Sequence, residues 1–520
     1  MHRRICTMAL ITLLLLGIPL AHPSAAVQAE ARPVLLLTDS MAIGTSKEGN
    51  VEALQRVLAS FGTEVTLESF DTYEPGTLAH YNHVIVVRNA DDYLELPERY
   101  KQDFETYEGR YLHIGTRLPD QVSEGLALEE TRVGKDAVRF QIGSFTETSM
   151  PVNGISYITQ AEGTRYGTMT SDLRQMTFPY GVMNGRYAYV PYFERGSLSE
   201  LAIGYLLRDW LAMPGSGQYY ALIRDIYPFS NLDLVNRMAD RLYEAGIPFI
   251  ASVRPVLSNA DYPAMKRYME TLKHVQARNG SLVVSTPIVT STLSQDVTTL
   301  KAQMGAFLDA MAEYGIAPLG IGAEMYWTYD RHYMSRGLAF FDSIVLFPNE
   351  RAVYREKTNT SVALSSTVYT LKAEEFRRMI PPAGAAAPPP MDTAIVYDFL
   401  EDEKRLEDTL HRLLSEWTPF ADYKNAPHAV RTDAHVVLAQ HGQLEIDGRG
   451  LAVNSAMQEI SSEHVYVQTG KKSLDALFTV QNRIFIVLIG LTLVVFSGLF
   501  VIGRRMYKRK YTGTGSGMEL

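Results

Sequence analysis

From residue 219 onward, short apolar segments alternate with segments that carry apolar residues at helical spacing. The apolar segments begin with YYALIRDI, PFIASVRPV and SLVVSTPI, and the helical pattern after the first places Val235, Met238 and Leu242 on one face. This alternation predicts parallel strands connected by helices. Further strands are expected in GIAPLGIG, SIVLFP, SVALSS and TAIVYDF. About seven such strands fit a closed α/β barrel at 218–425 better than an open sheet.

Strands and a helix alternate in the same way at residues 33–118. The sequences PVLLLTDS, EVTLESF, HVIVV and YLHIG are expected strands, and NVEALQRVLASFG is an expected helix. The pattern predicts an N-terminal α/β domain of the flavodoxin or glutamine-amidotransferase-like type. The loop TDSMAIGTSKEGN lies where such folds bind ligands, but it has no Gly-x-Gly-x-x-Gly pattern. Residues 119–215 predict a β-rich insert that ends in the helix LSELAIGYLLRDWLAM.

Both ends of the chain carry membrane signals. Residues 1–29 combine Arg3 and Arg4, a short apolar run and a small-residue cleavage point, which is typical of a secretory signal peptide; an uncleaved N-terminal anchor is the alternative. The uncharged stretch 484–503 is long enough to cross a bilayer. Basic residues open the tail 504–520 and predict a cytoplasmic C-terminus. We therefore expect a single-pass protein of the cell membrane, with the bulk of the chain extracytoplasmic.

Composition excludes several kinds of site and partner. The only cysteine, Cys6, lies in the expected signal peptide, so the mature chain would have no disulfide, no cysteine–zinc site and no amidotransferase nucleophile. A net charge of −9 argues against a nucleic-acid partner. The Asp447–Gly448 turn signal predicts a membrane-proximal β-hairpin region at 430–475. The Pro/Ala segment 380–392 predicts a flexible surface loop.

Three segments of the expected barrel, ALIRDIYPFSN, LYEAGIPFIASVRPV and GIAPLGI, resemble the polysaccharide deacetylase (NodB-homology) superfamily. The order of signal peptide, α/β domain, barrel and C-terminal anchor resembles an uncharacterised extracytoplasmic, membrane-anchored branch associated with bacterial exopolysaccharide clusters. The resemblance implies a deformed (β/α)7 barrel. It also implies a divalent metal held by one aspartate and two histidines, with a second aspartate as general base.

Positions that match this implied metal site have lost the required residue types. Asp225 matches the metal-binding aspartate, but Arg224 stands at the position of the base, and a guanidinium cannot accept a proton near neutral pH. Ser285 and Val289 stand at the two histidine positions, and residues 275–331 contain no histidine at all.

Two further elements of the family pattern are also changed. Glu324 and Met325 replace a Pro-His pair, and Tyr397 and Asp398 stand where a last histidine is expected. A catalytic metal site generally needs three protein ligands. The sequence therefore predicts a barrel with no metal site and no cofactor, and a degenerate deacetylase rather than an active one.

The expected carboxyl ends of the barrel strands still carry charged and aromatic side chains. Aromatic faces stack on sugar rings and charged groups bond to hydroxyls or amides, which makes these side chains candidate ligand-binding residues at the barrel mouth. They are Arg224, Asp225, Arg254, Glu324, Tyr326, Trp327, Tyr397 and Asp398. Alternatively, the MYWTY segment packs in the core, and Arg224 and Asp225 form an ion pair that fills a lost metal site.

The most economical functional hypothesis is a protein that binds or scaffolds a cell-surface polysaccharide during its synthesis or export, with synthase or export proteins as partners. One alternative is an active carbohydrate esterase or glycoside hydrolase, in which two carboxylates among Asp225, Glu324 and Asp398 serve as acid and base. Another is a structural protein that uses residues 33–118 to dock other membrane proteins.

Overall fold

A closed barrel of seven parallel strands lies in the region predicted to form one. The strands follow one another around the barrel in chain order, and the last pairs with the first. They are β10 (Tyr219–Ile226), β11 (Phe249–Val253), β12 (Gly280–Ser285), β13 (Pro318–Glu324), β14 (Ser343–Phe347), β16 (Ser366–Lys372) and β17 (Thr393–Asp398). Every residue of β11, β12 and β14 is buried, as expected for parallel strands that are covered on both faces. The barrel prediction is confirmed.

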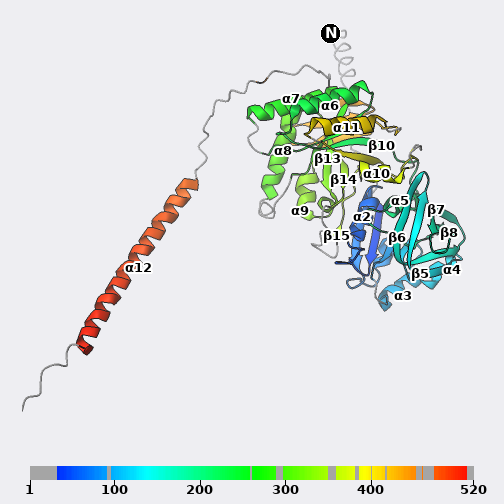
Figure 1. Ribbon diagram of the computed structural model, residues 1–520, viewed down its shortest axis with the longest axis horizontal. Coiled ribbons are helices and arrows are strands. Elements are labelled where there is room, and N and C mark those ends of the chain that lie inside the picture. Colours follow the sequence, from blue (N-terminus) through cyan, green and yellow to red (C-terminus); the bar gives the residue numbers. More distant parts are fainter. Residues whose placement is uncertain are drawn as a thin grey trace, which may run out of the picture. The chain divides into compact units, whose positions relative to one another are not determined.

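The computed structural model describes residues 32–90, 95–257, 261–287, 297–349, 359–380, 386–399, 401–415, 418–451, 460 and 474–511. The chain divides into two compact units, Met1–Ile460 and Ser461–Leu520. Figure 1 shows the elements of the first unit, which include the barrel and an N-terminal sheet. The expected signal peptide 1–29 lies outside the described residues.

Helices connect the barrel strands. Those that follow β10 to β13 are α6 (Leu232–Glu244), α7 (Pro263–Ala277), α8 (Val297–Glu313) and the short turns η2 (Met325–Thr328), α9 (Arg331–Tyr333) and η3 (Met334–Leu338). Those that follow β16 and β17 are α10 (Ala373–Met379) and α11 (Glu403–Ser415). In α6, the Asn231 side chain accepts a hydrogen bond from the Leu234 N–H, and Val235, Met238 and Leu242 are buried as the helical spacing predicts.

The sixth barrel strand differs from the prediction. SVALSS, residues 361–366, was expected to be a strand, but β16 begins only at Ser366 and runs through STVYTLK. The β-branched and aromatic residues Val368, Tyr369 and Thr370 are the buried part of this strand. The misplaced segment contains a short apolar run, but periodicity alone does not distinguish such a run from a buried loop.

The N-terminal part forms a mixed sheet of ten strands in the order β15-β2-β1-β3-β4-β9-β8-β7-β5-β6. The four predicted α/β strands are confirmed as β1 (Arg32–Thr38), β2 (Thr63–Ser69), β3 (His83–Arg88) and β4 (Arg110–Gly115). They are parallel to one another, with β1 between β2 and β3. The associated helices are α2 (Asn50–Ala59), η1 (Thr77–His80), α3 (Glu98–Thr106) and α4 (Asp120–Gly125).

The β-rich region continues the same sheet. Its strands are β5 (Glu129–Ile142), β6 (Phe145–Gln160), β7 (Thr164–Ser171), β8 (Thr177–Asn184) and β9 (Tyr187–Val190). Strand β9 pairs in parallel with β4, and the other four strands extend the sheet by antiparallel pairing. The predicted helix that follows is confirmed as α5 (Leu198–Trp210).

The N-terminal sheet and the barrel share one apolar core. After β14, the chain crosses to the sheet and adds the short strand β15 (Asn359–Thr360) antiparallel to β2. Helices α2 and α5 lie between the two parts, and all ten residues of α2 are buried (Figure 1). A helix that is buried on every side cannot display the clean polar face that a surface helix shows.

The described end of the Pro/Ala segment does not behave as the predicted flexible loop. The Tyr205 and Tyr219 hydroxyls donate hydrogen bonds of 2.9 and 2.7 Å to the carbonyls of Pro388 and Ala387. A Cβ added at Gly204 of α5 would lie only 2.8 Å from Cγ of Pro390, so this close packing requires glycine. Residues 386–392 are thus held between α5 and β10, while residues 381–385 lie outside the described part.

Four short antiparallel strands follow the barrel, in place of one hairpin. They are β18 (His428–Arg431), β19 (Val436–Gln440), β20 (Gln443–Ile446) and β21 (Arg449–Gly450), preceded by η4 (Tyr423–Asn425). Asp447 and Gly448 have φ angles of 52° and 72°, which confirms the predicted two-residue turn. Most of the predicted region beyond residue 451 lies outside the described residues.

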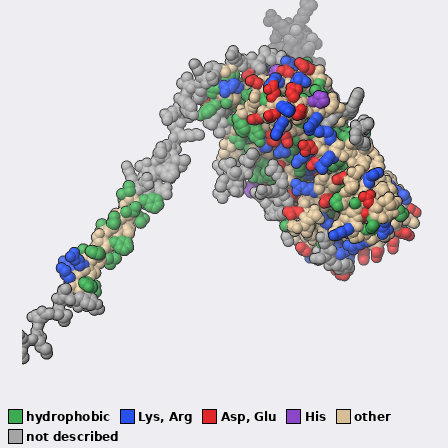
Figure 2. Space-filling view, viewed as in Figure 1, with side chains coloured by type: hydrophobic (Ala, Val, Ile, Leu, Met, Phe, Trp, Pro, Cys, Tyr) green, Lys and Arg blue, Asp and Glu red, His purple; other side chains and the backbone are tan. Residues whose placement is uncertain are grey.

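The second unit contains the helix α12 (Leu474–Tyr511). Its segment Phe485–Lys508 is 24 residues long with a mean hydropathy of 2.9, and it is long and apolar enough to cross a membrane. Apolar side chains cover it, and the basic side chains of Arg504, Arg505 and Lys508 gather at one end (Figure 2).

Candidate functional site

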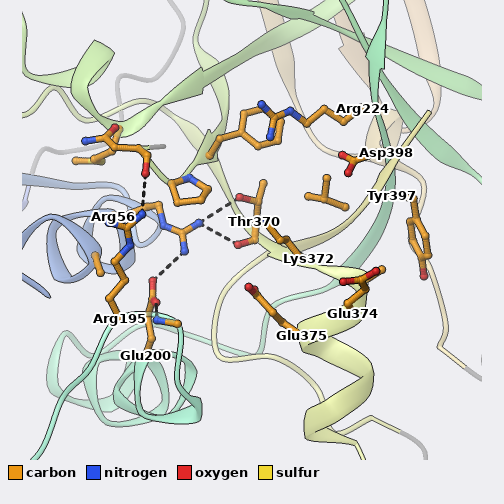
Figure 3. A pocket seen from close by; sticks show the side chains of 18 of the residues that line it. Arg56, Arg195, Glu200, Arg224, Thr370, Lys372, Glu374, Glu375, Tyr397 and Asp398 are labelled. Atoms are coloured by element: carbon orange, nitrogen blue, oxygen red, sulfur yellow. Dashed lines mark hydrogen bonds and ion pairs between the residues drawn. The ribbon is translucent and has the colours of Figure 1, made fainter. Parts of the chain in front are cut away.

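A pocket of about 560 Å³ opens at the carboxyl ends of β10, β14, β16 and β17, where barrels carry their functional sites. Helices α10 and α11 line one part of it, and α2 and α5 of the N-terminal region line another. Figure 3 shows Arg56 and Glu200 on one side of the pocket and Arg224, Tyr397 and Asp398 on the other. The charged side chains of the lining are Glu52, Arg56, Arg195, Glu200, Arg224, Asp225, Lys372, Glu374, Glu375, Arg377, Asp398 and Arg412.

The end of β10 is bulged at the two residues that the sequence singled out. Pairing with β11 shifts register between Ile223 and Ile226, and Asp225 has a φ of 65°. Aspartate tolerates this left-handed conformation better than most residues, and β-bulges at functional sites re-aim side chains. The Arg224 guanidinium lies 4.7 Å from the centre of the Phe347 ring in the pocket wall.

Asp225 is held between two arginines. Its Oδ1 lies 3.1 Å from Nη2 of Arg254, and its Oδ2 lies 3.6 Å from Nε of Arg224. Arg254 is itself fixed by a hydrogen bond of 2.8 Å from Nη1 to the Thr286 carbonyl. Guanidinium groups therefore occupy both carboxylate oxygens, which supports the ion-pair interpretation of Arg224 and Asp225.

These residues do not fit the divalent metal that the resemblance implies. A metal ion at Asp225 would meet the positive charges of Arg224 and Arg254 at the same carboxylate. Ser285, at one histidine position, is buried, and its Oγ lies 2.6 Å from Oγ of Ser252. Val289, at the other position, lies outside the described residues. Across the part of the chain that the structure describes, no three His, Cys, Asp or Glu side chains cluster to hold a metal.

The N-terminal wall of the pocket is built around a buried ion pair. Nη2 of Arg56 in α2 lies 2.8 Å from Oε1 of Glu200 in α5, and both side chains are almost fully buried. Nη1 of Arg56 donates to the Thr370 carbonyl at 2.9 Å, and the guanidinium lies 3.9 Å from the centre of the Tyr369 ring. The pair thus joins α2 and α5 to barrel strand β16 (Figure 3).

Hydrogen bonds complete the environment of Glu200. The Tyr369 hydroxyl donates to its Oε1 at 2.9 Å, and the Gly196 N–H donates to its Oε2 at 2.8 Å. Burial alone would raise the pKa of Glu200, but the Arg56 charge and these donors hold the pKa below its ordinary value. Glu200 is therefore an ionised carboxylate that fixes Arg56 in the pocket wall.

The predicted binding residues fall into two groups. Arg224, Asp225, Tyr397 and Asp398 line the pocket. The other four predicted residues lie at or just after neighbouring strand ends, outside the pocket lining; they are Arg254, Glu324, Tyr326 and Trp327.

Trp327 is the clearest member of the second group. It is fully buried and stacks on Tyr333 with ring centres 4.3 Å apart, so it packs in the core. Tyr326 is half-buried, meets Tyr333 edge-on, and donates a hydrogen bond from its backbone N–H to Oδ1 of Asn349. Glu324 is the last residue of β13, and Arg254 contacts the pocket through its ion pair with Asp225.

Sequence reasoning missed two groups of pocket residues. Arg56 lies in α2, Glu200 lies in α5 and Arg195 lies just before α5, all far along the chain from the barrel strands, so the strand-end rule does not point to them. Lys372 ends β16 and Glu374 lies in the first turn of α10, and the strand-end rule would have selected them if the sixth strand had been placed correctly.

No protein-family model matches this chain, and no curated protein matches it either. The closed seven-stranded parallel barrel is consistent with the deformed (β/α)7 barrel that the resemblance implies. The functional argument therefore rests on the pocket itself.

Proposed function

We propose that this chain is a membrane-anchored, extracytoplasmic protein that binds a cell-surface polysaccharide in the pocket at the barrel mouth, without cleaving it, during synthesis or export of the polymer. The observation that carries the proposal is the engagement of Asp225 by Arg224 and Arg254 in place of a metal ion. The deacetylase reaction of the family depends on that metal to activate water. A barrel mouth that retains its pocket but not its metal chemistry suits a binding protein.

The charge of the lining favours a neutral or zwitterionic ligand. Basic and acidic side chains line the pocket in equal numbers, and Figure 3 shows members of both kinds around it. A polyanion would meet Glu374, Glu375 and Asp398, while hydroxyl and acetamido groups could bond to donors and acceptors of either kind. The exposed face of the first unit in Figure 2 also shows interspersed acidic and basic side chains rather than one basic field.

The helix α12 supplies the anchor in this proposal. Its segment Phe485–Lys508 has the length and composition of a membrane span, and the basic cluster that begins at Arg504 supports a cytoplasmic C-terminus. Together with export directed by residues 1–29, this arrangement presents the pocket outside the membrane, where synthase or export proteins could be partners.

The test is a calorimetric titration of the detergent-solubilised full chain with oligomers of N-acetylglucosamine and of glucose. We expect saturable binding that Arg224→Ala and Asp398→Ala weaken about tenfold, since each removes one hydrogen-bonding side chain from the pocket. Asp172→Ala, on the exposed turn after β7 and outside the pocket lining, is the matched control. Absence of heat with every neutral or zwitterionic glycan would contradict the proposal.

The second candidate is a metal-free carbohydrate hydrolase. It is favoured by the presence of two carboxylates from different strands, Asp225 and Asp398, in one pocket. The same incubations distinguish it, because release of acetate or shortened oligomers that Asp398→Asn abolishes would establish hydrolysis.

A further inference from the structure

A half-buried tyrosine and an exposed phenylalanine form a stacked pair just after the strand end that lines the pocket. Tyr227 and Phe229 follow β10, and their rings are nearly parallel, with centres 4.9 Å apart and planes at 23°. Phe229 is 79% exposed, the highest value among the large apolar residues of the described part of the first unit. A phenylalanine so far from any core loses hydrophobic stabilisation, so its exposure requires a reason other than packing.

The aromatic pair is connected to the pocket through Arg254. The Arg254 guanidinium lies 5.7 Å from the centre of the Tyr227 ring, within the range of a cation–π contact. The same side chain makes the 3.1 Å ion pair with Asp225, which lines the pocket. Arg254 therefore fixes Tyr227 relative to the pocket, and Tyr227 supports one face of Phe229.

We propose that Tyr227 and Phe229 form a stacking platform for a sugar ring, and that the binding site extends from the pocket across Asp225 and Arg254 to this platform. This inference rests on the proposed function and specifies how long the ligand must be. It must be an oligosaccharide, with one part in the pocket and another part on Phe229. The axial C–H groups of a pyranose are weakly positive and meet the negative face of an aromatic ring, which suits equatorially substituted, β-linked sugars.

Ligand length separates the platform from the pocket in an experiment. The full chain in detergent is titrated with N-acetylglucosamine and with its β-1,4-linked hexasaccharide. We expect Phe229→Ala to weaken hexasaccharide binding about tenfold and to leave monosaccharide binding unchanged, because only the longer ligand reaches both places. Asp398→Ala should weaken both ligands. Leu173→Ala removes a side chain that is 68% exposed on a turn of the N-terminal sheet, and it serves as the control.

A tryptophan at the platform reports on contact directly. Of the three tryptophans, Trp210 and Trp327 are fully buried and Trp417 lies outside the described residues, so the signal of Phe229→Trp is read as its difference from the wild type with the same ligand. Its emission should shift to the blue with the hexasaccharide but not with the monosaccharide, and its hexasaccharide affinity should equal or exceed that of the wild type.

Each outcome decides one of the two proposals. Equal hexasaccharide affinity of the wild type and Phe229→Ala would overturn the platform and leave the pocket intact. Failure of the wild type to bind the monosaccharide and the hexasaccharide, and the glucose oligomers as well, would overturn both. Loss of binding to phosphatidylglycerol vesicles in Phe229→Ala, without loss of hexasaccharide affinity, would assign Phe229 to the membrane surface and also overturn the platform.

Discussion

The Arg254 guanidinium lies 3.1 Å from the carboxylate of Asp225, at the strand end where the deacetylase resemblance requires a metal ligand. Arg224 approaches the same carboxylate from the pocket side at 3.6 Å. Cationic side chains thus stand where a cation would bind. The pocket lies where barrels carry their functional sites, and in the proposal above its charges suit ligand binding rather than metal chemistry.

The backbone at Asp225 gives a prediction that separates charge from conformation. Both Asp225→Asn and Asp225→Ala remove the ion pairs, but only alanine is strained at a φ of 65°. The two pairs are partly exposed, so we expect Asp225→Asn to lower the free energy of unfolding by less than about 1 kcal/mol. Asp225→Ala should cost about 1 kcal/mol more. If urea denaturation gave the same free energy of unfolding for Asp225→Asn and Asp225→Ala, the assignment of strain to this residue would be contradicted.

The Arg56–Glu200 pair should contribute to stability far more than a surface pair does. Removing one partner leaves a buried charge, so Arg56→Met and Glu200→Gln should each lower the free energy of unfolding by about 3–5 kcal/mol. The double variant should be less destabilised than the sum of the single ones.

A matched control for that pair exists on the outside of the barrel. Arg241 and Glu407 lie 3.2 Å apart with both side chains about half exposed, and Arg241→Met should cost less than about 1 kcal/mol. If Arg56→Met and Arg241→Met had similar effects on thermal unfolding, Arg56 would not brace the pocket wall.

Stability should fall as the pH drops from about 6.5 toward 4. Burial lowers the pKa of His113 to about 4, and burial also lowers the pKa of His428. An unfolded histidine titrates near pH 6.5, so between these values the unfolded chain binds protons that the folded chain does not. For His113 this amounts to a loss of about 3 kcal/mol at the acid end.

Denaturation at several pH values checks this dependence. His113→Phe should flatten the acid limb of the curve, whereas replacement of the exposed His411 by glutamine should leave it unchanged. An acid limb that is identical in His113→Phe and the wild type would show that His113 is not the group responsible.

The topology can be tested with single cysteines. If residues 1–29 are removed, the mature chain has no thiol, and an introduced cysteine is the only target for a maleimide. Ser415→Cys in α11 should react with a membrane-impermeant maleimide in intact cells, and Ser516→Cys in the tail only after permeabilisation. The wild type should remain unlabelled, and the reverse labelling pattern would place the pocket inside the cell.

Much of the fold could be predicted from the sequence because buried parallel strands are continuous apolar runs. The strands β1 to β4 and six of the seven barrel strands lie where their runs of Val, Ile and Leu predict. The sixth failed because SVALSS is as apolar as a strand, although STVYTLK is the segment that pairs.

Only the part of the candidate site that the barrel itself supplies could be predicted from the sequence. Arg224, Asp225, Tyr397 and Asp398 could be placed at the pocket because strand ends of a barrel converge. Arg56 and Glu200 could not, since their role depends on how two separately built parts pack together. Trp327 was predicted to bind ligand from its place just after a strand end, with core packing of MYWTY as the alternative; strand position alone does not reveal that the ring is buried against Tyr333.

The central claim is that arginine side chains have replaced the metal at the barrel mouth. It is tested most directly by elemental mass spectrometry of the purified full chain after equilibration with zinc, manganese and nickel and removal of unbound ions. The account predicts much less than one equivalent of any of these ions per chain, with no difference between the wild type and Asp225→Asn. About one ion per chain, lost in Asp225→Asn, would contradict it.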